Sequence, residues 1–227
     1  RVAYGKGTKS VSDDRSLIRY LLRHRHTSCF EMAELKLHIK MPIFVARQWI
    51  RHRTASLNEV SARYSIINDE FYIPTQDDVA VQSKSNKQGR GESMTPEQAE
   101  VVRDRLLQDS QRNYSDYSAM LEMGVARELA RVNLTLNVYT EFYWKVDLHN
   151  LMHFLTLRTD SHAQKEIRVY ADMIADILKT WCPLVYEAWQ DYRVHAVEFS
   201  AQAMTAIRDA LEFAQSAGYV LKKPEGM

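Results

Sequence analysis

Basic side chains gather between residues 40 and 64, where five Lys or Arg residues stand against a single Glu. This segment therefore carries a local charge of +4 on a chain whose net charge is only +1. Arg51 and Arg53 lie where a helix-like pattern ends, and because they are two residues apart they point to different sides. A local basic patch on a nearly neutral protein indicates a small anionic ligand rather than a polyanion.

A second group of polar residues follows in an extended run. Glu59, Ser61 and Arg63 alternate there, so the sequence predicts that they share one face. A hydroxyl beside a guanidinium is a phosphate-binding pair, and Glu59 can accept hydrogen bonds from a ribose or a ring N–H. For Arg51 and Arg53 alone, the alternative is a helix end whose cations offset the helix dipole. That alternative does not account for the polar run.

Other chemistries are weaker in this sequence. Cys29 could act as a nucleophile, but small buried cysteines are common. His149 and His153 have a helical spacing that suits zinc, yet no Glu follows as in metalloproteases, and we predict no metal site. His162, four residues after Arg158, is either an exposed helical residue or a partner that orients that guanidinium. A non-catalytic nucleotide- or RNA-binding module is a second hypothesis, which the low net charge disfavours.

The elements that must position these residues form a helix-rich α+β pattern, with an antiparallel central sheet flanked by helices. Capping boxes are predicted at Thr95–Gln98 and Ser161–Gln164, and Pro42 is predicted as the first residue of a helix. Polar residues 75–93 are typical of a long surface loop. Periodicity and caps predict helices at 13–25, 42–51, 95–123, 127–134, 147–157, 161–181, 183–193 and 201–217, and strands at 33–39, 70–73 and 137–146.

Length and composition indicate one globular domain. The 227 residues can bury a sizeable core, and 45% hydrophobic with 26% charged residues is typical of such proteins. No apolar run approaches the roughly 18 residues of a membrane span. The two cysteines favour a reducing compartment, and we expect the cytoplasm.

The order of side chains in residues 51–64 resembles the signature of the flavin-dependent thymidylate synthases. Seven positions carry it: Arg51, His52, Arg53, Ser56, Glu59, Ser61 and Arg63. Further blocks in family order stand at 26–31, 42–49, 71–74, 130–131 and 157–167. The resemblance covers about residues 1–190, so it implies a family domain over 1–195 with a C-terminal helical extension over 196–227. It also implies that an N-terminal strand of the family, before the Arg1–Tyr4 block, is missing here.

This resemblance implies the reductive methylation of dUMP to dTMP without a cysteine nucleophile. Methylenetetrahydrofolate would donate the carbon, and FAD reduced by NADPH would supply the hydride. The resemblance also implies a homotetramer whose sites are shared between subunits, with neither nucleic acid nor membrane as a partner.

Roles for single residues follow from the same resemblance. Arg158 is the implied catalytic residue, because a guanidinium at the uracil edge stabilises negative charge as C5 becomes nucleophilic. The implied dUMP contacts are Gln48, Arg51, Glu59, Ser61, Ala62, Arg63, Arg131 and Arg158. The implied FAD contacts are Ser28, Arg51, His52, Arg53, Glu59, Asp147, His149 and His153, with His26 on the folate side. Ala62 and Ser28 depart from residues that are commoner in the family.

Overall fold

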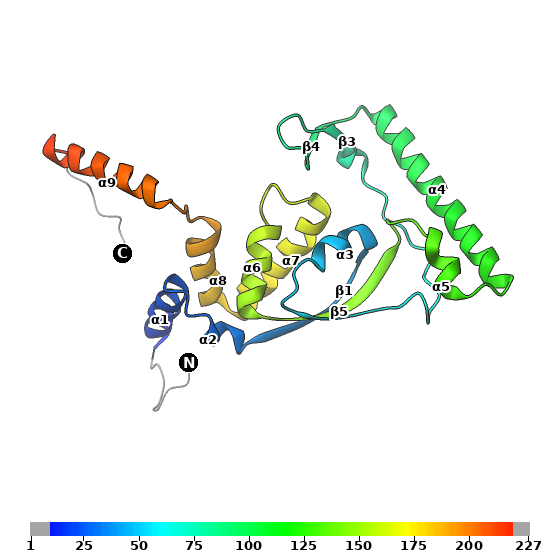
Figure 1. Cartoon of the computed structure of the whole chain (residues 1–227), viewed down its shortest axis with the longest axis horizontal. Coiled ribbons are helices and arrows are strands. Elements are labelled where there is room, and N and C mark those ends of the chain that lie inside the picture. The colour runs from blue at the N-terminus through cyan, green and yellow to red at the C-terminus, as the bar shows by residue number, and fades with distance from the viewer. Residues whose placement is uncertain (1–9, 220–227) are drawn as a thin grey trace.

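The computed structural model describes residues 10–219, so the Arg1–Tyr4 block and the last residues of the expected extension lie outside the described part. Figure 1 shows a central body of sheet and helices, with α4 (Pro96–Glu122) near one end and α9 (Ala201–Ser216) projecting from the other. Within residues 10–219, no helix combines the length and the hydropathy that a membrane span requires.

A three-stranded antiparallel sheet lies at the centre, in the order β1-β5-β2. The strand β1 (Glu34–Pro42) pairs with β5 (Tyr139–Asp147) along its whole length. The short β2 (Ser56–Glu59) extends the other edge of β5, with Ser56 opposite Lys145. Alternate residues of β5 are buried, because one face of the sheet packs on helices. The predicted α+β class with an antiparallel central sheet is confirmed.

Helices from both halves of the chain cover that buried face. Trp49, at the end of α3, is fully buried. Its ring lies 4.4 Å from Phe154 and 5.1 Å from Trp144, measured between ring centroids. This aromatic cluster joins α3 to β5 and α6 and fixes the two segments that carry the candidate site. The helices of this body are α1 (Val11–Arg23), α2 (Ser28–Glu31), α3 (Ile43–Trp49), α6 (Leu148–Arg158), α7 (Lys165–Trp181) and α8 (Pro183–Trp189).

Several predicted helix boundaries are confirmed. Thr95 forms the predicted capping box with Gln98 at the start of α4. Asp147 caps α6, where its Oδ1 accepts the Asn150 backbone N–H at 2.9 Å. Gly218 follows α9 with a φ of +84°, a conformation in which glycine is favoured. The helix predicted at 127–134 is α5 (Arg127–Ala130) followed by a 3-10 turn (Arg131–Asn133), and the helix predicted at 183–193 passes from α8 into a π-helix (Gln190–Val194).

The long loop predicted at 75–93 is wrong. After a 3-10 turn (Gln76–Asp78), the chain forms a hairpin of β3 (Ala80–Gln82) and β4 (Arg90–Ser93). The Gln82 side-chain amide donates to the backbone oxygens of Asn86, Lys87 and Gly89. Side-chain hydrogen bonds rather than an apolar face support this hairpin, so it leaves no alternating hydrophobic pattern.

Other predicted boundaries also fail, each for a local reason. The box at Ser161–Gln164 does not form, because the Asp160 carboxylate accepts the His162 backbone N–H at 2.8 Å and holds a turn, so α7 begins at Lys165. Pro42 ends β1 instead of opening the helix, with an extended ψ of 145°. The strand predicted at 70–73 is reduced to a single bridge between Phe71 and Val138. The first helix starts at Val11, two residues earlier than predicted, because Ser10 caps it.

Candidate functional site

Arg158 is the last residue of α6, and its half-buried side chain reaches across to the end of α3. Its Nε donates to His52 Nε2 at 2.9 Å, and its Nη2 lies 3.4 Å from the Gln48 backbone oxygen. Arg51, Arg53, Asn150 and His153 line the same cavity, which we call the Arg158 pocket. Two segments more than 100 residues apart in the sequence therefore build one cationic site.

The charge state of His52 explains how it holds Arg158. Burial, with help from the charges of Arg158 and His153, lowers the pKa of His52 from 6.5 to about 4. The imidazole is therefore neutral at pH 7, and its Nε2 lone pair accepts the arginine N–H while Nδ1 carries the proton. His52 orients the guanidinium without neutralising its positive charge.

The alternatives for His162 are resolved by the same geometry. Because α6 ends at Arg158, a residue four positions later no longer lies on the same helix face. His162 is exposed and its Nδ1 lies 2.8 Å from Asp160 Oδ1. The partner that orients Arg158 is His52, which no spacing rule in the sequence indicated.

A second cavity, the Arg131 pocket, is lined by Glu59, Ser61, Ala62 and Arg131. Thr140 Oγ1 of β5 donates to Glu59 Oε1 at 2.6 Å and holds that carboxylate at the cavity. Thr135 also lines the cavity, and its hydroxyl is one of the buried polar groups in residues 10–219 that has no hydrogen-bond partner. The Arg131 guanidinium at this cavity fits an anionic ligand. No pattern in the sequence pointed to Thr135 or Thr140.

The predicted alternation of Glu59, Ser61 and Arg63 on one face is wrong. The strand β2 ends at Glu59, and the chain then turns, with the Tyr64 backbone N–H donating to the Ser61 carbonyl at 2.9 Å. Arg63 leaves this face and forms an ion pair with Glu128 at 3.2 Å. Glu128 itself lines the Arg131 pocket, so Arg63 still lies next to it.

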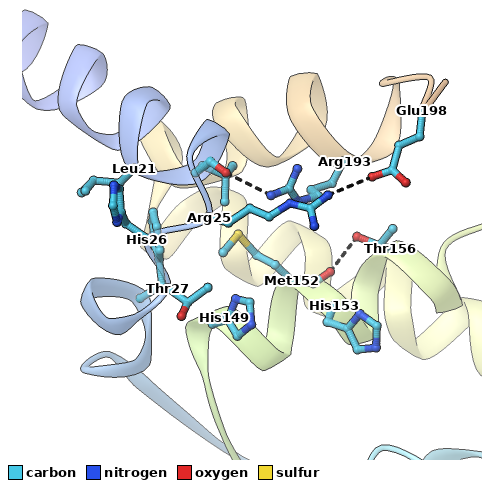
Figure 2. A pocket seen from close by; sticks show the side chains of 12 residues that line it. Leu21, Arg25, His26, Thr27, His149, Met152, His153, Thr156, Arg193 and Glu198 are labelled. Atoms are coloured by element: carbon cyan, nitrogen blue, oxygen red, sulfur yellow. Dashed lines mark hydrogen bonds and ion pairs between the residues drawn. The ribbon is translucent and has the colours of Figure 1, made fainter. Parts of the chain in front are cut away.

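A third cavity, the His26 pocket, lies between α1, α6 and the segment after α8 (Figure 2). His26 and Thr27 approach from the turn after α1, and His149 and His153 from α6. From the same turn as His26, the Arg25 side chain reaches across to an ion pair with Glu198 at 3.5 Å. His153 lines both this cavity and the Arg158 pocket, so the two are neighbours.

Two residues of the implied FAD set lie outside these three linings. Ser28 is exposed at the first turn of α2. The carboxylate of Asp147 is occupied in capping α6, since it accepts from both the backbone and the side chain of Asn150. Among residues 10–219, no group of three or more His, Cys, Asp or Glu side chains could hold a metal ion.

Comparison with known proteins identifies the family. The family model for "Thymidylate synthase complementing protein" matches residues 1–184. The flavin-dependent thymidylate synthase of Wolbachia pipientis wMel is 56% identical over 212 residues, which are 93% of this chain and 75% of that protein. The chain belongs to the flavin-dependent thymidylate synthase family.

Other members and a solved structure agree with this assignment. The flavin-dependent thymidylate synthase of Ruegeria pomeroyi is 58% identical over 215 residues, covering 93% of this chain and 71% of that protein. The UMP/dUMP methylase PolB from Streptomyces cacaoi, solved with 5-Br dUMP, superimposes with a TM-score of 0.77 at 31% identity. That match covers 83% of this chain and 84% of PolB. The family resemblance drawn from residues 51–64 is confirmed.

The family's signature residues are divided in this chain. Arg51, His52 and Arg53 line the Arg158 pocket, whereas Glu59 and Ser61 line the Arg131 pocket. The two pockets share no lining residue. A continuous motif of the flavin-dependent thymidylate synthases therefore lines two cavities of this chain, because residues 51–53 precede the strand β2 whereas Glu59 ends it and Ser61 follows it.

The lowered pKa of His52 predicts a pH dependence of stability. The unfolded chain binds a proton at His52 below about pH 6.5, whereas the folded chain resists it down to about pH 4. The folded state therefore has its full advantage above pH 6.5 and loses it as the pH falls toward 4. We expect the stability lost between pH 7.5 and 5 to be smaller by about 1 kcal/mol in His52→Gln, after a discount for the exposed part of the ring.

Urea unfolding of both proteins at the two pH values measures this difference. Equal losses in wild type and His52→Gln would show that His52 titrates as it does in the unfolded chain. His195→Gln is a suitable control, because His195 is exposed after the π-helix.

Proposed function

We propose that this protein catalyses the reductive methylation of dUMP to dTMP, with methylenetetrahydrofolate as the carbon donor. The observation that carries the proposal is the half-buried Arg158 guanidinium, held by neutral His52 and by the backbone of Gln48. PolB, which is similar in fold and 31% identical, is a UMP/dUMP methylase solved with a dUMP analogue. Together these support dUMP as the nucleotide of the Arg158 pocket.

Arg158 acts on the uracil ring in this proposal. A planar guanidinium offers parallel donors to a pyrimidine edge, and its positive charge is not offset because the neutral His52 that accepts its hydrogen bond contributes no negative charge. Negative charge that develops on the ring as C5 becomes nucleophilic is stabilised by this fixed cation. Partial burial, which lowers the pKa of Arg158, strengthens the interaction because less water screens it.

The Arg131 pocket supplies the phosphate and sugar contacts. Within residues 10–219, the Arg131 side chain has neither a carboxylate partner nor a hydrogen-bond partner. A free guanidinium in a cavity that Ser61 also lines suits a phosphate. Glu59, held by Thr140, is placed to accept from a sugar hydroxyl.

The residues around the Arg158 pocket also fit FAD. Arg51 and Arg53 are exposed at its rim and, in the described part of the chain, have no partner for their guanidinium groups. Free cations are what a diphosphate needs, and the His149 and His153 rings offer surfaces for a flat ring system. When bound, FAD reduced by NADPH supplies the hydride. His26 lines the same cavity as His149 and His153, and we place the folate on this side.

A homotetramer with shared sites is part of the proposal. The dUMP contacts of one chain fall into two cavities with no common lining residue, which favours a site completed by a neighbouring subunit. A stripe of exposed apolar residues on α7 supports association, because its members recur every fourth residue on one helix face. They are Val169, Met173, Ile177 and Trp181, which are 49%, 62%, 41% and 40% exposed.

We also propose that residues 196–227 form an extension of the family domain rather than part of its core. Among the described residues of this segment, α9 has no buried side chain. The family match ends at residue 184. The free thiols of Cys29 and Cys182 support a reducing compartment, for which we propose the cytoplasm.

Tritium release from C5-labelled dUMP tests the function. We expect the purified protein to be yellow with bound flavin and to release tritium only when FAD and NADPH are present. Formation of dTMP should require methylenetetrahydrofolate as well. Colourless protein that cannot be reconstituted with FAD would contradict the proposal. Polynucleotide binding with a steep salt dependence would instead support the RNA-binding alternative.

A further inference from the structure

A cluster of charged side chains is connected to Gln48 through Gln164 and takes no part in the function proposed above. Its centre is Glu166 in the first turn of α7, which is only 7% exposed. Oε1 of Glu166 accepts from the Tyr72 hydroxyl at 2.7 Å and pairs with Arg90 of β4. Oε2 accepts from the Gln164 side-chain amide at 2.8 Å. Each carboxylate oxygen therefore has its own partners.

Glu166 is ionised in this environment. Burial alone would raise its pKa, but the hydrogen bonds from Arg90, Tyr72 and Gln164 favour the charged form and hold the pKa below its usual value. Arg90 also lies 3.7 Å from Asp78, and Asp78 pairs with Lys165. The cluster thus joins the β3–β4 hairpin to α7 and keeps a fixed negative charge beside Gln164.

This charge determines which way the Gln164 amide faces. An ionised carboxylate has no hydrogen to donate, so Gln164 must turn its NH2 group toward Glu166 and its carbonyl toward Gln48. Gln48 Nε2 then donates to the Gln164 carbonyl. Within residues 10–219 the carbonyl oxygen of the Gln48 amide accepts no hydrogen bond, and the backbone oxygen of the same residue accepts from Arg158. Gln48 therefore links the cluster to the Arg158 pocket.

We propose that Glu166 and Gln164 are positioning residues that orient the Gln48 amide, so that Gln48 presents a carbonyl acceptor to a hydrogen-bond donor of the bound nucleotide. This inference rests on the proposed function, since dUMP is the nucleotide that Gln48 would contact. The donors of dUMP at neutral pH are its 3′-hydroxyl and its N3–H. Without Glu166, the side-chain amides of Gln48 and Gln164 could both rotate by 180°. Gln48 would then present its NH2 group, which repels either donor of dUMP.

The orientation matters for selectivity because an acceptor that a bound nucleotide covers without supplying a donor loses its hydrogen bonds to water, which is costly. A nucleotide that lacks the relevant donor should bind the wild type more weakly than dUMP by roughly 5- to 100-fold. That penalty disappears when the amide can rotate to present a different group. We therefore expect the cluster to create a preference for dUMP over a nucleotide that lacks the donor. A cluster that only stabilised the fold would not create this preference.

Gln164→Leu is the most direct test, because it removes the hydrogen bonds that link Glu166 to Gln48. The hydrogen bonds from Arg90 and Tyr72 to Glu166 remain. Binding of dUMP, its 3′-deoxy analogue and N3-methyl-dUMP is measured by calorimetry, well below the unfolding midpoint. We expect dUMP to bind about 3- to 10-fold more weakly, and the preference for dUMP over one analogue to shrink. The analogue affected identifies the donor. FAD content should stay that of the wild type.

Glu166→Gln is the second variant, since an amide at 166 can donate as well as accept. We expect the same loss of preference, with KM for dUMP raised more than kcat is lowered. Tyr72→Phe is the matched control, because it removes a hydrogen bond from Oε1 but leaves Oε2 and the charge, so the preference for dUMP should remain.

The outcomes separate this inference from the proposed function. Wild-type protein that binds neither FAD nor dUMP would overturn the function itself. Wild-type protein that binds and converts dUMP, together with an unchanged ligand preference in both Gln164→Leu and Glu166→Gln, would overturn only the positioning role. A drop in preference in Tyr72→Phe as large as in Gln164→Leu would also overturn it, because the effect would then follow general loosening of the cluster.

Discussion

Replacing Arg158 with lysine is expected to lower kcat for dTMP formation by about 10²- to 10³-fold, as the loss of a donor aimed at developing charge does in other enzymes. The Nε of Arg158 donates to His52 while its Nη2 reaches the backbone oxygen of Gln48, so the plane of the guanidinium is fixed at two points. A lysine ammonium keeps the charge but cannot reproduce that planar fork. Turnover should fall while bound FAD stays.

Steady-state kinetics and the flavin absorbance of the same sample measure both effects. Arg208→Lys is the matched control, because Arg208 is exposed on α9. Turnover of Arg158→Lys equal to that of the control would remove Arg158 from the mechanism.

Mixing two impaired variants is expected to restore activity. Arg131→Met alone should lower kcat/KM for dUMP by about 10- to 100-fold, since it removes a charge-assisted contact to the phosphate. If Arg131 and Arg158 of one site come from different subunits, a hybrid oligomer with Arg158→Lys contains sites in which both residues are intact. Random mixing should then return about a quarter of wild-type activity, because about one site in four is whole.

Co-expression with two affinity tags isolates the hybrid, and each variant purified alone is the control. Activity of the hybrid no higher than the mean of the two parents would show that each site takes both arginines from one chain. This result would contradict the shared site while leaving the reaction untouched.

Local chemistry made much of the fold predictable. The hydrogen bonds of the capping box at Thr95 and of the cap at Asp147 join residues close together in the sequence. The aromatic and β-branched residues of β5 form a pattern of period two. The failures lie where a longer-range or competing bond decides. The Asp160 carboxylate accepts the His162 backbone N–H and holds a turn where a helix was predicted to begin, and the Gln82 amide supports a hairpin without an apolar face.

The family was predictable from the amino-acid sequence, because the spacing from Arg51 to Arg63 and the further blocks are local properties of the chain. The family pattern also predicts that Arg158 lies at the uracil ring. The residues that hold Arg158 could be found only in the folded structure, since His52 and Arg158 are 106 residues apart. The same is true of Gln48 and Gln164, which are 116 residues apart. Such contacts depend on the register of β1, β5 and β2 and on the packing of α3, α6 and α7, which no local spacing encodes.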